Sequence, residues 1–184
     1  MSGSTVDTEY EHGSFIGITE TGGSERLGSA FARATIGINE RVTLVTAAHG
    51  DACHSSSDTS SSSQTVGAFS PRVSLAYRMG DNGFTIRGSV FGGFRAPTLN
   101  ELYRSFQVGN DLTFANETLT PERLKSAEAG VSFSRGPASI RVTGFWSVLD
   151  NAVTNVTLAT SPEFNVRRRE NADRIRSIGL EFEG

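Results

Sequence analysis

The chain has 184 residues, a formal net charge of −3 and a single cysteine. This length suits one domain, the slightly acidic balance gives no basic field for nucleic acid, and one cysteine excludes an intrachain disulfide. No run of about 18 apolar residues occurs, which excludes a transmembrane helix. The apolar fraction of 36% is low for a soluble domain but suits strands in which every second residue is apolar.

Residues 1–27 have the least readable pattern. Residues 14–19 predict one strand, and the glycine-containing residues 21–24 predict a loop. Met1 is followed by polar residues and not by a charged segment and an apolar core, so we expect no signal peptide. We therefore expect a soluble protein or an internal segment of a longer one. Because the pattern is poor before residue 28, we interpret residues 1–27 as a lead-in and residues 28–184 as the main domain.

Two-residue periodicity dominates the rest of the chain and predicts β-strands. The clearest example is 84–95, and similar alternation occurs at 72–79, 126–133, 140–148 and 177–183. The alternation predicts one apolar face and one polar face. The apolar face is expected to carry Val73, Leu75, Ile86, Val90, Val131, Val142 and Ile178. The polar face is expected to carry Arg87, Ser89, Glu128, Thr143 and Glu181.

The connections between these segments alternate between short and long. Short turns are predicted near Asn39, Asp81 and Gly136, and long loops at 54–65, 97–121 and 155–167. This alternation predicts an all-β antiparallel meander with its turns at one rim and its loops at the other. Segments of about 11–14 residues, at ~3.3 Å per residue and a tilt near 40°, span roughly the hydrocarbon core of a membrane.

The strand at 84–95 ends in an unusual run, Phe-Arg-Ala-Pro-Thr-Leu-Asn-Glu-Leu-Tyr at 94–103. Pro97 cannot donate to a sheet and disfavours helix at the residue before it, so the chain is expected to leave the sheet there. Thr98 and Glu101 have the spacing of a capping box, which predicts a single helical turn. Its apolar residues Leu99, Leu102 and Tyr103 are expected to fold back over the upper wall.

Further motifs follow in a fixed order: Asn-Glu-Thr-Leu-Thr-Pro-Glu at 116–122, Glu-Ala-Gly at 128–130, and Gly-Leu-Glu at 179–181. In combination they resemble the C-terminal half of the barrel of TonB-dependent outer-membrane receptors. Glu117 is a departure, because the family usually has proline there. The resemblance is carried by Phe94, Arg95, Ala96, Pro97, Thr98, Leu99, Glu101, Leu102, Tyr103, Asn116, Leu119, Pro121, Glu122, Glu128, Gly130, Asn171, Gly179 and Glu181.

The resemblance implies part of a transmembrane β-barrel in the outer membrane of a Gram-negative bacterium, in contact with outer-membrane lipid. It implies uptake of an iron–siderophore, cobalamin or a similar large nutrient. TonB would act only through a plug domain. We recognise neither the plug nor the closing strands in the sequence, so we expect a partial barrel of about seven or eight strands. No cofactor and no nucleic-acid partner are expected.

Two sets of residues are candidates for contact with a ligand. Arg104, Phe106, Gln107 and Asn110 lie in the first long loop. Their side chains either face a ligand at the outer mouth or only anchor the loop. Arg167 and Arg168 belong to a basic cluster that either attracts an anionic siderophore or pairs with Glu170, Asp173 and lipopolysaccharide phosphates.

Other functional classes have weaker support in the sequence. A soluble β-sandwich or an adhesin-like binding module remains the alternative, because a polar face suits solvent as well as a wet lumen. We expect no enzyme, since no Ser/His/Asp or paired-carboxylate constellation has a recognisable spacing. We expect no metal site, because Cys53, His49 and His54 fit no standard ligand spacing.

Overall fold

The computed structural model describes residues 2–11 and 14–184, with side chains from residue 22 onward. Strands make up most of the described chain, as the periodicity predicts. The elements are β1 (Ser2–Glu11), β2 (Ser14–Gly37), β3 (Val42–Ser57), β4 (Ser63–Arg78), β5 (Phe84–Arg95), α1 (Leu99–Tyr103), β6 (Phe106–Val108), β7 (Asp111–Phe114), β8 (Glu122–Arg135), β9 (Ala138–Asp150), β10 (Val153–Thr160), β11 (Asn165–Asn171) and β12 (Arg174–Glu183).

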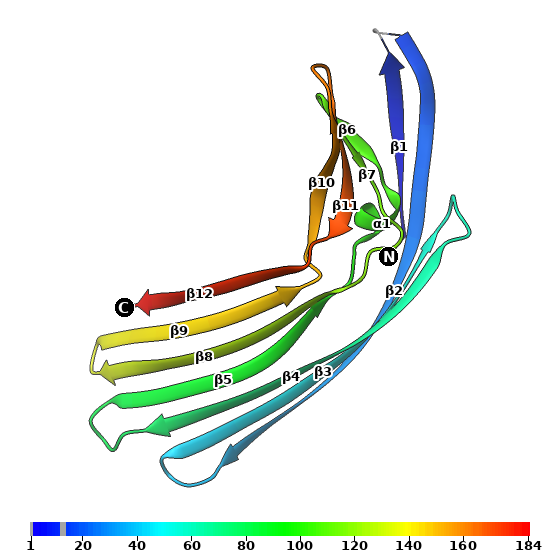
Figure 1. Ribbon diagram of the computed structural model, residues 1–184. Coiled ribbons are helices and arrows are strands. Elements are labelled where there is room, and N and C mark those ends of the chain that lie inside the picture. Colours follow the sequence, from blue (N-terminus) through cyan, green and yellow to red (C-terminus); the bar gives the residue numbers. More distant parts are fainter. Residues whose placement is uncertain (1, 12–13) are drawn as a thin grey trace.

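Eight strands form one antiparallel sheet in the order β1-β2-β3-β4-β5-β8-β9-β12. Figure 1 shows this sheet as a curved wall. The turns at Asn39, Asp81 and Gly136 lie at one edge of the wall, here called the lower rim. The connections that contain Ser60, Asn110 and Ser161 lie at the opposite edge, the upper rim. The predicted all-β meander and its two unequal rims are confirmed.

The strand register fixes which residues share a face of the wall, because residues directly paired in a ladder point to the same side. One row crosses five strands through Val73, Val90, Ala127, Trp146 and Ile178. The neighbouring row is Ser74, Ser89, Glu128, Phe145 and Gly179. The register therefore confirms the predicted division into an apolar face and a polar face for every residue assigned to them.

In the part of the chain whose side chains the structure describes, most of the apolar face is exposed. Val90 is 56% exposed and Ile178 83% exposed, whereas the buried apolar side chains among the described residues are Cys53, Leu102, Leu119, Val148 and Ala152. A contiguous exposed apolar surface of this kind needs an apolar environment or a partner. Among the residues that the structure describes, no helix is long and apolar enough to cross a membrane.

The long connections are more structured than the sequence predicts. A loop was expected at 54–65, but only residues 58–62 lie outside the strands. β3 and β4 remain paired up to Ser56 and Ser63. The Oγ atom of Ser57 accepts hydrogen bonds from the backbone amides of Thr59 and Ser60 and closes this turn. Serine-rich composition indicated a loop here, but paired strands accommodate serine when the neighbouring strand supplies the backbone hydrogen bonds.

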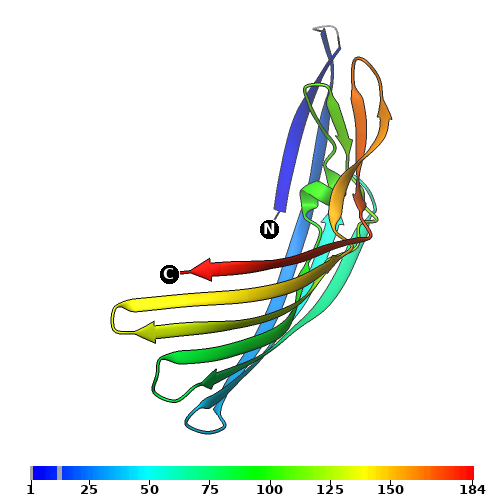
Figure 2. The ribbon, with the colours of Figure 1, turned by 60° about the vertical axis from the view of Figure 1, so that its left-hand side comes forward.

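The other two connections, 97–121 and 155–167, build a second sheet of four strands in the order β10-β11-β7-β6. Its β11–β7 pair is parallel, unlike the pairs of the large sheet. Figures 1 and 2 show this small sheet and α1 rising from the upper rim, beside β1 and the upper half of β2. The two connections lie far apart in sequence, so no local pattern indicated that they pair.

The loop predicted at residues 21–24 is wrong, because these residues lie inside β2, which runs unbroken from Ser14 to Gly37. Position 23 requires glycine because atoms of Ser56 and Tyr103 approach its backbone closely, and not because the chain turns there. A Cβ atom there would lie 2.8 Å from the carbonyl oxygen of Ser56 and 3.2 Å from Cδ2 of Tyr103. The division into a lead-in of residues 1–27 and a main domain of residues 28–184 remains an interpretation of the sequence.

The two faces predict opposite responses to an introduced charge. In the membrane-spanning barrel that the sequence resemblance implies, Val90→Arg would place a guanidinium on the apolar face and should cost about 2–4 kcal/mol of folding free energy. Ser89→Arg, one residue away, should cost much less, because Ser89 already donates a hydrogen bond to Glu128 (Oγ–Oε2, 3.2 Å) on the polar face. Urea titrations of the receptor in lipid measure both values, and equal losses would contradict the assignment of faces.

Candidate functional site at the upper rim

The short helix α1 begins at the predicted capping box. The Oγ1 atom of Thr98 accepts a hydrogen bond from the amide of Glu101 (3.3 Å), and the Glu101 carboxylate accepts one from the amide of Thr98 (2.8 Å). These reciprocal bonds satisfy backbone donors that a helix start leaves open. The box therefore fixes the angle at which the chain leaves β5 after Pro97.

Arg95, the last residue of β5, links this helix to the large sheet. Its Nη1 atom lies 2.9 Å from Oε2 of Glu101, and its Nε atom lies 2.6 Å from Oε2 of Glu122, the first residue of β8. The other carboxylate oxygen of Glu122 accepts a hydrogen bond from the amide of Val153 at the start of β10 (2.8 Å). One guanidinium thus holds together the exit of one strand, the entry of the next and the base of the small sheet.

The charges of this cluster stabilise one another. Burial favours the neutral form of Glu101, but hydrogen bonds from Arg95 and Thr98 outweigh it and hold the pKa of this carboxyl below its usual value. Glu101 therefore stays ionised at neutral pH, as its salt bridge with Arg95 requires.

The apolar residues of α1 fold back on the wall, as predicted. Leu102 is fully buried, and so is Leu119 further along the same connection. The carbonyl of Leu119 accepts a hydrogen bond from Nε2 of Gln64 on β4 (2.9 Å). Gln64 pairs with Ser55, which lies on the polar face and is also buried. The motif thus covers the upper end of the polar face and leaves the apolar face open.

Two asparagines fasten the rest of the connection to the small sheet. Nδ2 of Asn116 donates to the carbonyl of Arg169 (2.8 Å), and its backbone amide donates to the carbonyl of Glu101 (3.0 Å). Asn171 accepts a hydrogen bond from the amide of Thr120 (2.8 Å) and donates to the carbonyl of Asn151 (2.7 Å). Because each amide bridges segments that are distant in sequence, both side chains hold the loop cluster in shape.

The two motif glycines lie where the wall has no room for a side chain. A Cβ atom on Gly130 would lie 2.5 Å from the carbonyl oxygen of Val142, and one on Gly179 would lie 2.7 Å from the ring of Phe145. The acidic motif residues Glu128 and Glu181 are on the polar face, near Arg72, Arg87 and Arg141. These charged residues come from separate strands and line one hollow of about 430 Å³.

The six candidate ligand residues lie in or beside the small sheet but do not form one cluster. The register places Phe106 and Arg167 on one face of this sheet, and Gln107 and Arg168 on the other. Arg104 and Phe106 are partly buried. Gln107 and Asn110 are exposed near the tip of the β6–β7 hairpin, where Nε2 of Gln107 donates a hydrogen bond to the carbonyl of Gly109 (3.0 Å).

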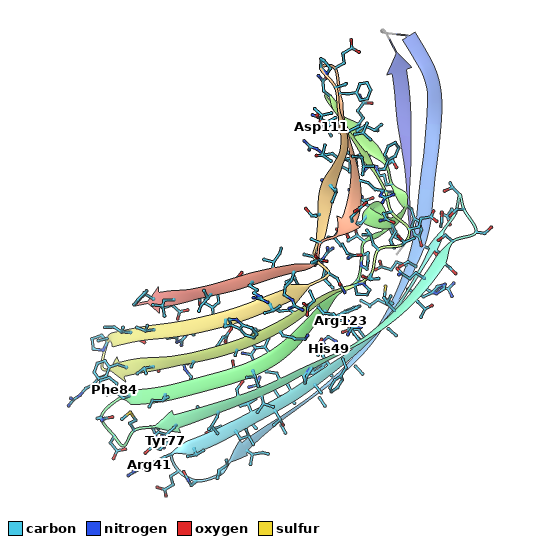
Figure 3. The ribbon with its side chains drawn as sticks, viewed as in Figure 1. Arg41, His49, Tyr77, Phe84, Asp111 and Arg123 are labelled. Atoms are coloured by element: carbon cyan, nitrogen blue, oxygen red, sulfur yellow. The ribbon has the colours of Figure 1, made fainter. Side chains whose placement is uncertain are left out.

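The basic cluster pairs extensively with its neighbours. Arg167 lies 3.1 Å from Asp111 (Nη1–Oδ2), and Nε of Arg168 donates to Glu170 (2.9 Å). Figure 3 shows Asp111 high on the small sheet. The predicted pairing of the cluster with Glu170 is therefore present for Arg168.

Arg169 belongs to the predicted basic cluster but was not among the candidate ligand residues, and the structure gives it a linking role. Its guanidinium lies 5.1 Å from the centroid of the Phe106 ring and donates to the backbone carbonyl of Asn100 in α1. Burial lowers the pKa of this guanidinium. Only the pairing of β11 with the first loop brings Arg169 to α1, so its position in the sequence gave no signal of this role.

The residues around Cys53 make separate contacts. Cys53 is buried, His49 Nε2 lies 3.3 Å from Asp51 Oδ1, and Nδ1 of His54 lies 2.8 Å from Oγ1 of Thr65. In the part of the chain that the structure describes, no three His, Cys, Asp or Glu side chains gather as a metal site would require.

Removing the central guanidinium should loosen the cluster. Arg95→Gln leaves Glu101 and Glu122 facing each other without a cation, so the cluster should lose about 1–3 kcal/mol of local stability. Hydrogen exchange of the α1 amides and proteolysis within residues 96–121 measure this loss. Arg87→Gln on the same strand is the matched control, since Arg87 lies outside the cluster. Unchanged protection in Arg95→Gln would contradict the linking role.

The same cluster should respond to acid. Because the pKa of Glu101 is lowered by folding, its contribution to stability is complete above the usual glutamate pKa and is lost as the pH falls through the lowered value. Protection of the α1 amides should therefore persist from about pH 7 to the usual glutamate pKa and fall below it. Glu101→Gln should abolish this step, and a step that survives the substitution would assign the titration to another group.

Comparison with known proteins agrees with this geometry. The sequence matches the family model described as "TonB dependent receptor-like, beta-barrel" over residues 4–184. Comparison with curated proteins gives no significant match. Among solved structures, the chain resembles the hemophore receptor HasR of Serratia marcescens in complex with its hemophore HasA and heme. The TM-score is 0.76 at 16% identity, and the match covers 89% of this chain and 32% of that one.

Two further structures have the same fold. The copper transporter OprC gives a TM-score of 0.74 at 14% identity, with 95% of this chain and 29% of that one covered. The siderophore receptor PirA of Acinetobacter baumannii gives 0.64 at 17% identity, with 89% and 26% covered. The chain spans about a third of the length of the first two structures and about a quarter of the third. Together with the family match, the likeness disfavours a soluble sandwich and shows that this chain belongs to the TonB-dependent receptor β-barrel family.

Proposed function

We propose that this chain is a wall segment of a receptor in the outer membrane of a Gram-negative bacterium, and that the receptor takes up a large nutrient with energy from TonB. The observation that carries the proposal is the wall itself. One face is apolar and uncovered, the opposite face is lined by charged groups, and a cross-linked loop cluster stands at one rim. This arrangement suits a barrel with lipid outside and a wet passage inside.

The proposal assigns the parts of the wall to different partners. The apolar face contacts outer-membrane lipid, and the charged hollow on the polar face contacts a plug domain, through which TonB acts. The soluble binding module is the weaker alternative, because it leaves the exposed apolar face unexplained. We propose no catalytic role for this chain, and we assign the ion pairs of Arg95 with Glu101 and Glu122 the role of joining structural elements.

The nutrient proposed is an iron–siderophore or a ligand of similar size and charge. By name, HasR is a hemophore receptor, PirA is a siderophore receptor and OprC is a copper transporter, so the family resemblance leaves the ligand class broad. The exposed residues Gln107, Asn110 and Arg168 are proposed to meet the ligand. Arg104, Phe106 and Arg167 are partly buried and are proposed to hold that surface in position.

Uptake by the whole receptor tests the proposal. With the receptor as the sole route for an anionic ferric siderophore, the double variant Gln107→Ala/Arg168→Gln should lower uptake at limiting ligand about 10-fold, as loss of a charge-assisted hydrogen bond predicts. Arg41→Gln at the lower rim is the control and should leave uptake unchanged. Surface abundance of each variant is measured alongside.

The possible results separate the ligand site from the function. Normal uptake in the double variant, with uptake lost on deletion of the receptor, would overturn the ligand residues alone. Uptake that persists without the receptor, for each siderophore, heme or copper complex tried, would overturn the proposed function.

A further inference from the structure

The outer side of β10 (Val153–Thr160) is an open strand edge. In the small sheet β11 pairs with one side of β10, and no strand of the described chain pairs with the other side. Figures 1 and 2 show β10 as the outermost strand of this sheet. Residues 154–160 are all exposed, so this edge is accessible from the solvent.

One hydrogen bond at the base of β10 shows which backbone groups point outward. The amide of Val153 donates to Oε1 of Glu122 (2.8 Å) and therefore points away from β11. Residues of an antiparallel ladder alternate between bonding the partner strand and pointing away from it, so the backbone groups of Asn155 and Thr157 point outward as well. A bulge between Thr157 and Ala159 interrupts the regular edge beyond them. The usable edge therefore runs from Val153 to Thr157.

The side chains of β10 do not protect this edge. Native sheets usually discourage the addition of a strand with charged residues, with proline or with very short edge strands. β10 has eight residues, Val-Thr-Asn-Val-Thr-Leu-Ala-Thr, and none of them is charged or proline. By contrast, the edge strand β6 of the same sheet has three residues, and the edge strands β1 and β12 of the large sheet carry several charges each. Among the strands that the structure describes, β10 is thus the one long uncharged edge.

The contacts between connections at the upper rim are of a different kind, because amide side chains fasten them. Asn116 donates to the carbonyl of Arg169 (2.8 Å). Asn171 accepts from the amide of Thr120 (2.8 Å). The one amide side chain of β10, Asn155, makes no hydrogen bond to another segment of the described chain. An edge that offers only backbone groups suits a partner that binds and leaves, more than a permanent neighbour within the receptor.

We propose that the open edge of β10 docks an extended segment of a separate protein, which adds to the small sheet as a further, antiparallel strand. The outward backbone groups of Asn155 and Thr157 bind the backbone of this segment. Its side chains alternate between the two faces of the sheet. Those beside Val156, which is 37% exposed, are apolar, and those beside Asn155 and Thr157 are polar. The inference goes beyond the proposed uptake of a nutrient and does not depend on which nutrient is taken up.

The test uses the whole receptor in nanodiscs and a fluorescent probe, a short capped peptide of alternating threonine and valine. Asn155→Pro removes an outward N–H group and no bond to β11, and an edge strand tolerates proline at such a position. The affinity for the probe, measured by fluorescence anisotropy, should fall about 10-fold, because a backbone hydrogen bond is lost and the ring obstructs the edge. Thr157→Pro should give the same loss. Thr154→Ala is the control and should leave the affinity unchanged, since the backbone groups of Thr154 face β11.

Modified probes separate recognition of the backbone from general apolar attraction. In the antiparallel pair the threonines of the probe lie opposite Asn155 and Thr157 and donate their amides to β10. N-methylation of the threonine amides should therefore weaken binding to the native receptor about 10-fold, whereas N-methylation of the valine amides should not.

Hydrogen exchange of the native receptor shows whether the edge is free. The amides of Asn155 and Thr157 should exchange rapidly in the free receptor and slowly once the probe is bound. Slow exchange in the free receptor would mean that another receptor segment or a second copy already covers β10, and would overturn the proposal. Equal binding by the native receptor and both proline variants, an equal loss in the control, or equal effects of the two modified probes would also overturn it. Protection of the β11 amides verifies that the small sheet is intact in the proline variants. Where that protection is lost, the modified probes on the native receptor decide.

Discussion

The ion pairs of Arg95 with Glu101 and Glu122 are the contacts on which the upper rim depends. A wall of paired strands is stable along its ladders, but the chain leaves and re-enters that wall between β5 and β8 across more than twenty residues. Loop closure over such a length has an entropic cost, which local hydrogen bonds alone offset poorly. The ladder between β5 and β8 runs up to the Arg95–Glu122 pair, so the loop begins and ends at one point, and the ion pair between these two side chains reinforces that junction. The helix α1 and the start of β10 then attach to the same point.

This anchoring explains why the small sheet forms where it does. Once Arg95 and Asn116 hold the first connection in place, β7 presents an edge to which β11 adds in parallel. Arg169 then reaches the carbonyl end of α1 and lies over Phe106. The loop cluster is therefore cross-linked by charge and by amide hydrogen bonds, with only Leu102, Leu119 and a few other residues as an apolar core. A polar cluster of this kind suits a position in water above an apolar wall.

The wall below has the opposite character. Its strands satisfy one another's backbone groups, while the side chains of one face remain exposed and apolar. In water that surface would favour association of the protein with other apolar surfaces. In a bilayer it would contact lipid chains, which are also apolar. The polar face keeps Glu128 near Arg72 and Arg141 near Glu183, charges that hydrocarbon would not tolerate. The two faces thus require two different solvents, and this requirement supports a barrel wall more directly than any single residue does.

The sequence alone determined the wall. Period-2 alternation specified the strands and their two faces, because the side chains of a strand alternate strictly between its sides. The register in the structure agrees for Val90, Glu128 and the other residues assigned to the two faces. The capping box of Thr98 and Glu101 was equally readable, since both of its hydrogen bonds lie within four residues. Tertiary structure decided the rest. The small sheet, the position of Arg169 on Phe106 and the need for glycine at position 23 all arise from contacts between segments distant in sequence. Serine and glycine indicated loops when they were read locally, because only the partner strand reveals which backbone groups are paired. The same holds for the arginines, since only the folded chain shows which of their charges are neutralised.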